Sequence, residues 1–304
     1  MKPTAIRCTT ESALGDVLAR LGDGAADALA AGRIFIGKRR AQTAEDRVPA
    51  GTEVVCYDAR SAADAPLEIL AEADGLVAVM KPHDIATIAD HHGRSGTLVA
   101  VTAKALGLPE ERLFPTSRLD VGVSGVVLFA LDDAARAAVA RARDESRYAR
   151  HYVAIAAAPP EPNQGRWAAP IGRDRDPRKR RVNGRDAIPA ETAYAVVAAA
   201  RAGALLAAEP KTGRTHQIRV HAAHAGTPLF GDRAYGGATR IVSPSGGVTA
   251  VERIALHAAW IDVALAGGRR LYAEAPVPPD LRALWRAVGG DDSEWTAAVL
   301  KLEG

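Results

Sequence analysis

The sequence predicts an α+β fold with a mixed, mainly antiparallel sheet and flanking helices. Apolar segments of strand length are joined by tight turns such as Asp74-Gly75, a pattern that indicates antiparallel hairpins. Helical patterns are interspersed among these strands and do not alternate with them, which disfavours a doubly wound parallel sheet. Residues 124–130 run into a continuous apolar stretch without polar alternation. Such a stretch is typical of a strand buried on both faces.

The first 62 residues are expected to form a small α/β module of their own. Apolar residues at helical spacing predict a helix over residues 14–21, and a second short helix follows over residues 25–31. Strands are predicted over residues 33–38 and 53–57.

Residues 63–290 are expected to form the larger domain, and residues 291–304 a C-terminal tail without a recognisable pattern. Periodicity and turn signals define its elements. The expected strands are 67–70, 76–80, 124–130, 150–155, 192–200, 204–209, 256–263 and 271–275, and the expected helices are 97–106, 132–147, 215–226 and 281–288.

Composition bounds the class of protein. The chain has 304 residues, of which 48% are hydrophobic, so a sizeable core is available. Cys8 and Cys56 offer neither a disulfide framework nor metal-ligand spacing. The first residues lack an apolar signal region and no stretch has the length of a membrane span, so we expect a monomeric cytoplasmic protein that does not act at a membrane. The net charge of +3 is only mildly basic, so nucleic-acid binding must depend on local patches.

Two stretches carry candidate chemistry. Arg118-Leu119-Asp120 precedes the buried strand, so a carboxylate lies at the mouth of a rigid element. An isolated aspartate there is also compatible with a turn in which it caps a backbone amide. The second stretch, Thr212 to His221, predicts a turn and then a helix that Thr215 caps.

That second helix has a buried side and a neighbouring stripe of polar residues. Gly226 should end the helix, with Ile218, Ala222 and Ala225 on its buried face. Arg219 lies on the neighbouring stripe and can reach inward.

These motifs occur in the order of a known family. The order is Arg118-Leu119-Asp120, Ser124-Gly125, Gly213 to His221, Gly231-Asp232, Tyr235-Gly236-Gly237 and Leu256-His257-Ala258. Residues 65 to 280 thereby resemble the RluA-like pseudouridine synthases, which modify ribosomal and transfer RNA. The resemblance implies the pseudouridine synthase fold with a central cleft across its sheet, an RNA partner and no cofactor.

The resemblance also implies roles for residues of the site. Conversion of uridine breaks the bond between ribose and ring nitrogen and rejoins the ribose to carbon 5, which requires an ionised carboxylate beside the sugar. Asp120 takes that role, as nucleophile or as the base that removes a sugar proton. Arg219 would stabilise the carboxylate, and Tyr152 would stack on the base and handle the proton of carbon 5. Arg118 would fill the gap left by a flipped-out base.

Other basic residues are candidates for holding RNA. The segment from Arg173 to Arg185 is expected to be a loop, and a run of such residues either contacts phosphates or is a solvated face. The candidates are Arg178, Lys179, Arg180 and Arg181 in that loop, and Arg214 and His216 in the long motif.

The small module resembles the RNA-binding domain named after ribosomal protein S four, although the acidic, alanine-rich stretch at 22–31 departs from that pattern. Its remaining basic cluster is Arg33, Lys38, Arg39 and Arg40.

Three alternatives compete with this interpretation. One is a non-catalytic RNA-binding or ribosome-assembly protein that kept the fold, although intact Asp120, Tyr152 and Arg219 argue against it. Another is a glycosidase, which would need a second acid in the cleft; Asp232 is the nearest candidate but looks structural. The third is a zinc site of His216, His221 and His224 with Asp232, which no cysteine supports.

Two departures from the family pattern border the site. Ser117 stands where histidine is usual, and Val121-Gly122-Val123 replaces a polar stretch. We expect both to affect which RNA fits.

Overall fold

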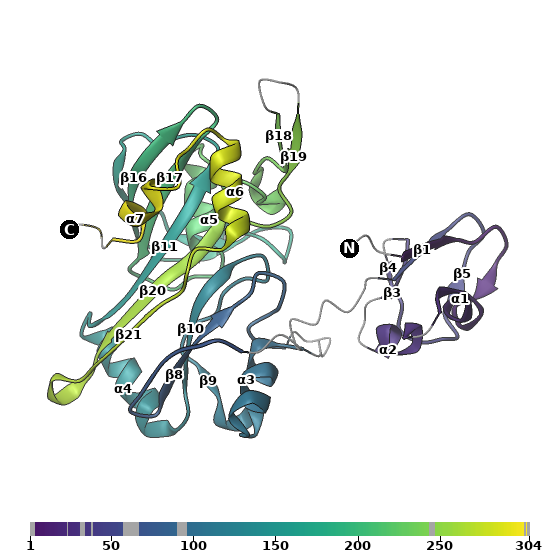
Figure 1. The fold of residues 1–304 in the computed structure, drawn as a ribbon, viewed down its shortest axis with the longest axis horizontal. Helices are drawn as coiled ribbons and strands as arrows, with labels where there is room; N and C mark the ends of the chain where they lie inside the picture. Colours follow the sequence, from purple (N-terminus) through teal and green to yellow (C-terminus); the bar gives the residue numbers. More distant parts are fainter. Residues whose placement is uncertain are drawn as a thin grey trace. The chain divides into compact units, whose positions relative to one another are not determined.

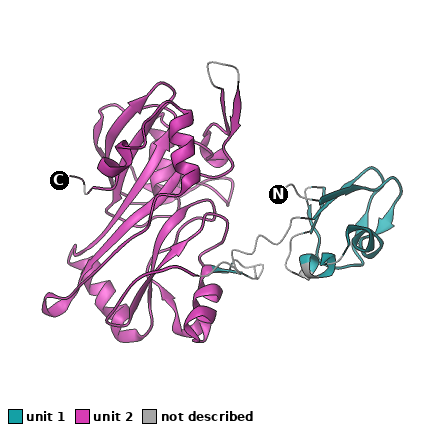
Figure 2. Cartoon of the chain, in the orientation of Figure 1, with its two compact units in different colours: residues 1–66, 89–97 teal, residues 67–88, 98–304 magenta. Residues whose placement is uncertain are grey.

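The computed structural model describes residues 4–22, 24–30, 34–37, 39–56, 67–89, 96–242, 247–300 and 302. The chain divides into two compact units (Figure 2). The small unit comprises Met1–Pro66 with Ala89–Thr97, and the large unit comprises Leu67–Ile88 with Leu98–Gly304.

The small unit has a core of its own, in which Leu14, Val17 and Leu18 pack with Ile34 and Val54. The helices and strands predicted for it are present within the described residues, whereas residues 31, 33, 38 and 57 of those predictions lie outside them. Its elements are β1 (Thr4–Arg7), β2 (Ser12–Ala13), α1 (Leu14–Leu21), α2 (Ala25–Ala30), β3 (Ile34–Ile36), β4 (Arg39–Arg40), β5 (Arg47–Val48) and β6 (Glu53–Cys56). The strands pair in the order β1-β6-β3-β4, with β2 and β5 as a separate pair.

The basic cluster expected in the small unit is only partly described. Arg33 and Lys38 lie outside the described residues. Arg39 forms an ion pair with Asp46 at 3.2 Å, and the Arg40 guanidinium lies 5.6 Å from the centre of the Phe35 ring.

A ten-stranded sheet is the framework of the large unit (Figure 1). Its strands are β7 (Ile69–Ala73), β8 (Leu76–Lys81), β9 (Phe114–Pro115), β10 (Ser124–Ala130), β11 (Tyr148–Ala156), β12 (Gln164–Trp167), β16 (Thr192–Ala200), β17 (Gly203–Pro210), β20 (Leu256–Ala264) and β21 (Arg270–Glu274). The order is β12-β16-β17-β11-β20-β10-β8-β7, with β9 paired to β10 and β21 to β20. Strands β10 and β20 run parallel and the other pairs run antiparallel, so the predicted mixed, mainly antiparallel sheet is confirmed.

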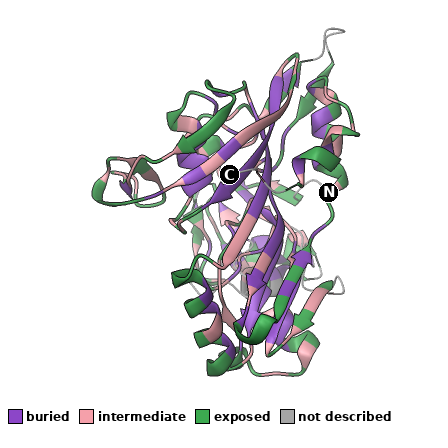
Figure 3. Ribbon diagram, turned by 90° about the vertical axis from the view of Figure 1, so that its left-hand side faces the viewer, coloured by how far each residue is buried: buried purple, intermediate pink, exposed green. Residues whose placement is uncertain are grey.

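Strand β10 is buried along all seven residues, as the uninterrupted apolar run predicts. Figure 3 shows that buried residues are concentrated in the strands of the large unit. It joins β20 through only two residues, Ser124 and Gly125. A Cβ atom at Gly125 would lie 2.2 Å from the carbonyl oxygen of Ala258, and the φ of this glycine is +122°. Only glycine therefore allows the two strands to approach where the Asp120 loop enters the sheet.

Helices cover the sheet and contribute residues to its two hydrophobic cores. They are α3 (Leu98–Leu106), α4 (Asp133–Asp144), α5 (Gln217–His224), α6 (Pro279–Ala287) and α7 (Glu294–Ala298), with 3₁₀ turns η1 (Glu110–Arg112), η2 (Arg233–Tyr235) and η3 (Ala266–Gly268). Asp132 caps α4, because its Oδ1 accepts a hydrogen bond of 2.8 Å from the Ala135 amide. The apolar face of α4 packs on β8, β10 and β20, whereas α6 and α7 pack on β11 and β17.

The C-terminal segment is more ordered than its sequence indicates. Trp295 of α7 is 2% exposed and belongs to the core. His151 on β11 donates a hydrogen bond of 2.7 Å from Nε2 to the carbonyl of Ala298, and Trp260 donates one of 2.7 Å to the carbonyl of Val299. The contacts that fix this segment come from strands far away in the sequence, so no local pattern reveals them.

The segment from Arg173 to Arg185 is only partly the loop that the sequence predicted. Residues 174–179 form that loop, whereas the flanking residues contribute to a three-stranded sheet of β13 (Ile171–Arg173), β14 (Arg180–Val182) and β15 (Arg185–Ile188), which we call the basic sheet. The remaining strands are β18 (Arg240–Val242) and β19 (Val248–Ala250), which pair with each other. In the described part of the chain, no helix combines the length and the apolar character that a membrane span requires.

Candidate active site

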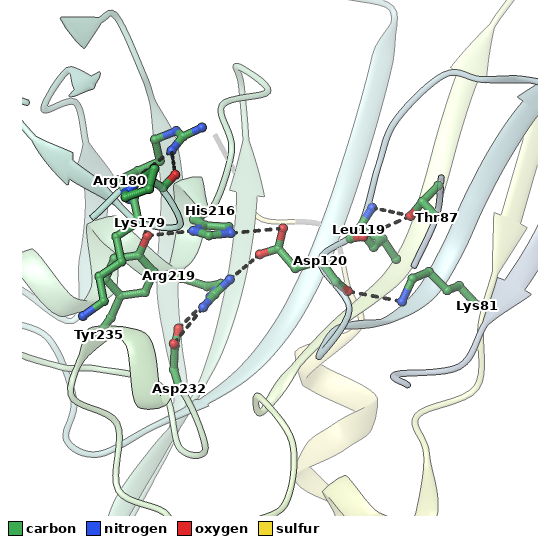
Figure 4. A network of polar contacts seen from close by, with 11 residues as sticks. Lys81, Thr87, Leu119, Asp120, Lys179, Arg180, His216, Arg219, Asp232 and Tyr235 are labelled. Carbon is green, nitrogen blue, oxygen red and sulfur yellow. Dashed lines mark hydrogen bonds and ion pairs between the residues drawn. The ribbon is translucent and has the colours of Figure 1, made fainter. Parts of the chain in front are cut away.

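The loop that carries Asp120 is anchored by a buried ammonium group (Figure 4). Lys81 ends β8 and is fully buried. Its Nζ donates hydrogen bonds to the carbonyl oxygens of Pro82 at 2.9 Å, Asp120 at 3.2 Å and Val123 at 2.7 Å. Burial lowers the pKa of Lys81 to about 7, with the charge of Asp120 acting in the opposite direction. Three carbonyl acceptors match the three donors of an ammonium group, so this arrangement stabilises the charged form.

A second anchor holds the residue before Asp120. The hydroxyl of Thr87 donates to the Leu119 carbonyl at 3.0 Å and accepts from the Leu119 amide at 3.1 Å. The backbone on both sides of Asp120 is therefore fixed, while its side chain remains 27% exposed.

Helix α5 divides the residues of the long motif between two tasks. Gln217 and His221 lie one helical turn apart and face the neighbouring strands. Gln217 Nε2 donates to the carbonyl of Glu191 at 2.8 Å, and His221 Nδ1 lies 3.0 Å from the hydroxyl of Thr192. His216 and Arg219, three residues apart, face Asp120.

The start of α5 differs from the prediction. The cap position is His216, whose backbone is left-handed at φ 59° and whose side chain makes no capping hydrogen bond, so Thr215 is not the cap. Ala225 is exposed and does not belong to the buried face, although Ile218 and Ala222 do. The left-handed residue turns the His216 ring toward the carboxylate and away from the helix end.

Arg219 links two carboxylates. Its Nη1 donates to Asp120 Oδ2 at 2.6 Å. Its Nε and Nη2 donate to the two oxygens of Asp232 at 2.7 and 2.8 Å, and its guanidinium lies 5.0 Å from the centre of the Tyr235 ring. Burial lowers the pKa of Arg219, but its hydrogen bonds and the charges of Asp232 and Asp120 raise it more. The fork on Asp232 fixes the plane of the guanidinium and leaves Nη1 for Asp120.

His216 connects Asp120 to the basic sheet. Its Nε2 lies 3.8 Å from Asp120 Oδ1, and its Nδ1 lies 2.7 Å from the Tyr235 hydroxyl. That hydroxyl also accepts a hydrogen bond of 2.8 Å from the Arg180 amide. Burial lowers the pKa of His216, while the charge of Asp120 raises it.

Tyr152 lies on β11, where it pairs with Ala208 on one side and Ala258 on the other. It is 7% exposed. Burial raises the pKa of Tyr152 to about 12, with a smaller increase from the charge of Asp120 against a decrease from Arg150. Its hydroxyl is therefore protonated at neutral pH.

In the structure, Arg219 and His216 contact Asp120, and the charge of Asp120 also affects the pKa of Tyr152. Arg118 is exposed and has no hydrogen-bond or ion-pair partner among the described residues. The other residues proposed for RNA binding divide into those with partners and those without. Arg214 donates to the carbonyl of Pro189, and Arg178 pairs with Asp176. Arg180 donates to the carbonyls of Pro177 and Lys179. The side chains of Lys179 and Arg181 have no hydrogen-bond or ion-pair partner among the described residues.

Comparison with known proteins agrees with this geometry. A model of the family described as RNA pseudouridylate synthase matches residues 75–224. An uncharacterized RNA pseudouridine synthase of Bacillus subtilis (strain 168), YhcT, is 32% identical over 294 residues, which cover 94% of this chain and 86% of that protein. The chain belongs to the RNA pseudouridine synthases.

Further relatives agree with this membership. The ribosomal large subunit pseudouridine synthase D of Xanthomonas campestris pv. campestris is 34% identical, with 76% of this chain and 72% of that protein covered. The solved structure of human RNA Pseudouridylate Synthase Domain Containing 4 superposes with a TM-score of 0.58 at 24% identity, over 73% of this chain and 92% of that one. The RluA-like resemblance and the pseudouridine synthase fold are thus confirmed, and the synthase is an isomerase that converts uridine in RNA to pseudouridine.

Two contributors to the site of the synthase were not assigned from the sequence. Lys81 directly follows the strand predicted over 76–80, and Tyr235 belongs to the motif Tyr235-Gly236-Gly237, but neither residue has a predicted role at the site. The pair Lys81-Pro82 is a signal for the first, because a lysine that ends an apolar strand must find acceptors if it is buried. Tyr235 follows Asp232 by three residues, and both approach Arg219 from the 3₁₀ turn η2 and its start.

The geometry also bears on two of the alternatives. Both oxygens of Asp232 are bound by Arg219 and its side chain is 1% exposed, so it offers no second acid for glycoside hydrolysis. His221 uses its ring nitrogens on Thr192 and on the carbonyl of Ala169, and His224 is exposed. Within the described ranges, no group of three or more histidine, cysteine or acidic residues is placed to hold a metal ion.

Proposed function

We propose that this synthase modifies ribosomal RNA and that Asp120 performs the chemistry at the target uridine. The choice of RNA rests on relatives such as the Xanthomonas protein, whose name assigns it to the large ribosomal subunit. The observation that carries the choice of residue is the contact of 2.6 Å between Asp120 Oδ2 and Arg219 Nη1. It combines an oriented carboxylate with a side chain that is still 27% exposed to an incoming nucleotide.

Arg219 and Asp120 would act as a unit. Breaking the bond between the ribose and N1 leaves electron deficiency at the sugar, which an ionised carboxylate stabilises by covalent attack or by removing a sugar proton. Arg219 occupies Oδ2, so the opposite oxygen, Oδ1, whose contact with His216 Nε2 is longer at 3.8 Å, is the one that would approach the ribose. Asp232 prevents Arg219 from rotating away, because it holds two of the three nitrogens of the guanidinium.

Tyr152 would pack against the base and donate a hydrogen bond to it in this reaction. A phenol with a pKa of about 12 keeps its proton at neutral pH, so it is a poor acceptor for the proton that leaves carbon 5. We assign to Tyr152 the packing of the detached base and the donation of a hydrogen bond to it while it rotates.

Access to a stacked uridine requires that the base leave the helix, at a cost of a few kcal/mol. Arg118 is exposed two residues before Asp120 and has no hydrogen-bond or ion-pair partner in the described part of the chain. Its planar guanidinium can therefore occupy the vacated position in the stack without breaking a contact of its own.

The substitution Asp120→Asn tests the assignment. It preserves the shape of the side chain and its hydrogen bond from Arg219 but removes the negative charge. We expect conversion of uridine in bulk ribosomal RNA to fall by at least about 10³-fold, the scale for loss of a catalytic group, with RNA affinity retained.

Asp262→Asn is the matched control, because Asp262 is a partly exposed partner of Arg270 on β20. That variant should convert RNA at the wild-type rate. Conversion by Asp120→Asn within tenfold of wild type would remove Asp120 from the mechanism, and absence of conversion by the wild-type protein would favour the non-catalytic RNA-binding alternative.

A further inference from the structure

The basic sheet surrounds a hollow of about 670 Å³. Its lining comes from β13 and β14, the turn between them, and the turn into β15. The lining residues are Arg173, Asp174, Arg175, Pro177, Arg180, Arg181, Asn183, Gly184 and Arg185. Five guanidinium groups and one carboxylate therefore converge on a single concave surface, which favours an anionic ligand.

The arginines of this surface are not equivalent. Arg173 and Arg185 share Asp186 at 3.8 and 3.7 Å, distances too long for a firm ion pair. Arg175 and Arg181 are exposed, and neither guanidinium has a hydrogen-bond or ion-pair partner among the described residues. These two groups are free to bind a ligand without first breaking a contact.

Arg178 is the opposite case. It does not line the hollow, and it forms a two-pronged pair with Asp176 through Nε at 3.0 Å and Nη2 at 2.9 Å. This guanidinium would have to break its pair with Asp176 before it could bind a phosphate with the same groups. Of the run Arg178-Lys179-Arg180-Arg181 that the sequence indicated, Arg180 and Arg181 line the hollow.

The hollow is rigidly connected to the active site. Ile171 of β13 packs with Ala190 and with Val220 of α5 in one small core, against which Val182 and Tyr235 also pack. The Arg180 amide bonds the Tyr235 hydroxyl, which in turn meets His216 beside Asp120 (Figure 4). A ligand in the hollow therefore lies at a fixed position relative to the carboxylate.

The chemistry of the lining selects between parts of a nucleotide. No aromatic side chain lines the hollow, so it lacks the aromatic platform on which proteins commonly stack the bases of a single strand. Guanidinium groups match phosphate oxygens in geometry and charge, whatever the base sequence.

We propose that the hollow binds the phosphodiester backbone of the RNA strand that carries the target uridine, through Arg175 and Arg181. This inference rests on the proposed function, since the strand must also present its uridine to Asp120. The hollow holds the strand beside the flipped nucleotide, and Asp120 and Tyr152 act on the base and sugar.

The test measures the affinity of a single-stranded oligouridylate as a function of KCl concentration, for wild type, Arg175→Ala/Arg181→Ala and Arg178→Ala. Two lost phosphate contacts on a single strand should reduce the slope of log affinity against log salt by about 1.4. Affinity of the double variant at moderate salt should fall about tenfold or more. Arg178→Ala is the matched control and should keep the wild-type slope.

Two competitors identify the source of the anion. Inorganic phosphate, compared with KCl at equal ionic strength, should not displace the oligouridylate, whereas displacement would show a free-anion site. Polyglutamate should bind far more weakly than the oligouridylate, and equal binding would indicate an acidic protein as the partner. An unchanged slope in the double variant, or an equal loss in Arg178→Ala, would also overturn the proposal.

Single-turnover conversion separates this proposal from the proposed function. The double variant should need about tenfold more protein than wild type to reach half of its maximal rate on bulk ribosomal RNA, because its loss lies in binding. If the double variant keeps the wild-type salt slope and converts RNA normally, the proposal that the hollow binds RNA is wrong, and the function proposed for Asp120 is unaffected. If the wild-type protein converts no RNA, the proposed function fails whatever the slopes show.

Discussion

Arginine performs two different tasks in two neighbouring regions of the large unit. At the active site, the Arg219 side chain is 7% exposed and each of its three nitrogens donates to a carboxylate. In the basic sheet, Arg175 and Arg181 are exposed, and no hydrogen-bond or ion-pair partner occurs for them in the described ranges.

The difference teaches that burial and partners, more than residue type, decide what a guanidinium does. A buried arginine without partners would cost several kcal/mol, so Arg219 is fixed by Asp120 and Asp232 and serves to orient them. An exposed arginine costs nothing to leave unpaired, so those of the basic sheet remain available for a phosphate.

The largest expected effect follows from removing the buried arginine. Arg219→Met leaves Asp232 buried without its partner, so we expect the free energy of unfolding to fall by about 3–5 kcal/mol. Conversion of uridine should be lost as well. Arg270→Met, which breaks an exposed pair with Asp262, is the control and should leave the free energy of unfolding close to the wild-type value.

Denaturant unfolding of both variants measures this contrast. Equal losses of stability for Arg219→Met and Arg270→Met would show that burial does not distinguish the two arginines. A stable Arg219→Met variant with wild-type conversion would also remove Arg219 from the active site.

An intermediate effect concerns a second buried polar network, at the junction of β10 and β20. Arg253 Nη2 donates to Ser124 Oγ at 2.7 Å, and that hydroxyl lies 2.8 Å from His257 Nδ1. His257 Nε2 donates to the carbonyl of Ala275 at 3.2 Å, so Nδ1 is unprotonated and accepts the Ser124 hydroxyl proton. Burial and then the charge of Arg253 lower the pKa of His257 to about 4, from an ordinary value of 6.5.

This depressed pKa predicts a loss of stability in acid. His257 becomes protonated below about pH 6.5 in the unfolded chain, but only below about pH 4 in the folded chain. The free energy of unfolding should therefore decrease by up to about 3 kcal/mol as the pH falls through this window. His257→Asn should abolish that part of the pH dependence, whereas His224→Asn, on the exposed end of α5, should retain it.

Unfolding free energies between pH 7 and pH 4 provide the measurement. The same acid-side slope in His257→Asn and wild type would show that His257 is not the neutral acceptor of this network.

The smallest expected effect sharpens the distinction within the basic sheet. Asp176→Asn removes the two-pronged ion pair that occupies Arg178, a pair that also lowers the pKa of Asp176 to about 2. The released guanidinium should bind the oligouridylate slightly more tightly and increase the salt slope by less than about one unit. Affinity against salt measures it, and a decreased slope would mean that Arg178 already contacts RNA while it is paired.

Local features determined most of the fold. The strand at 124–130 was recognisable because its continuous apolar run can be read from the sequence without knowing the neighbouring strands. The hairpin at Asp74-Gly75 was recognisable because these two residues alone define its turn. The motif order likewise indicated the family and paired Asp120 with Arg219, although 99 residues separate them. These signals are properties of short segments, and a sequence displays them directly.

Tertiary structure alone decided which polar groups are occupied. The bonds of Lys81 to the carbonyls of Asp120 and Val123, the connection from Arg180 through Tyr235 to His216, and the docking of α7 on β11 all join residues that are distant in sequence. The basic sheet is another example, because its hollow forms only when β13 pairs with β14 and β15. Such contacts depend on the position of a whole strand or helix, and burial then determines whether a charge is fixed or left free.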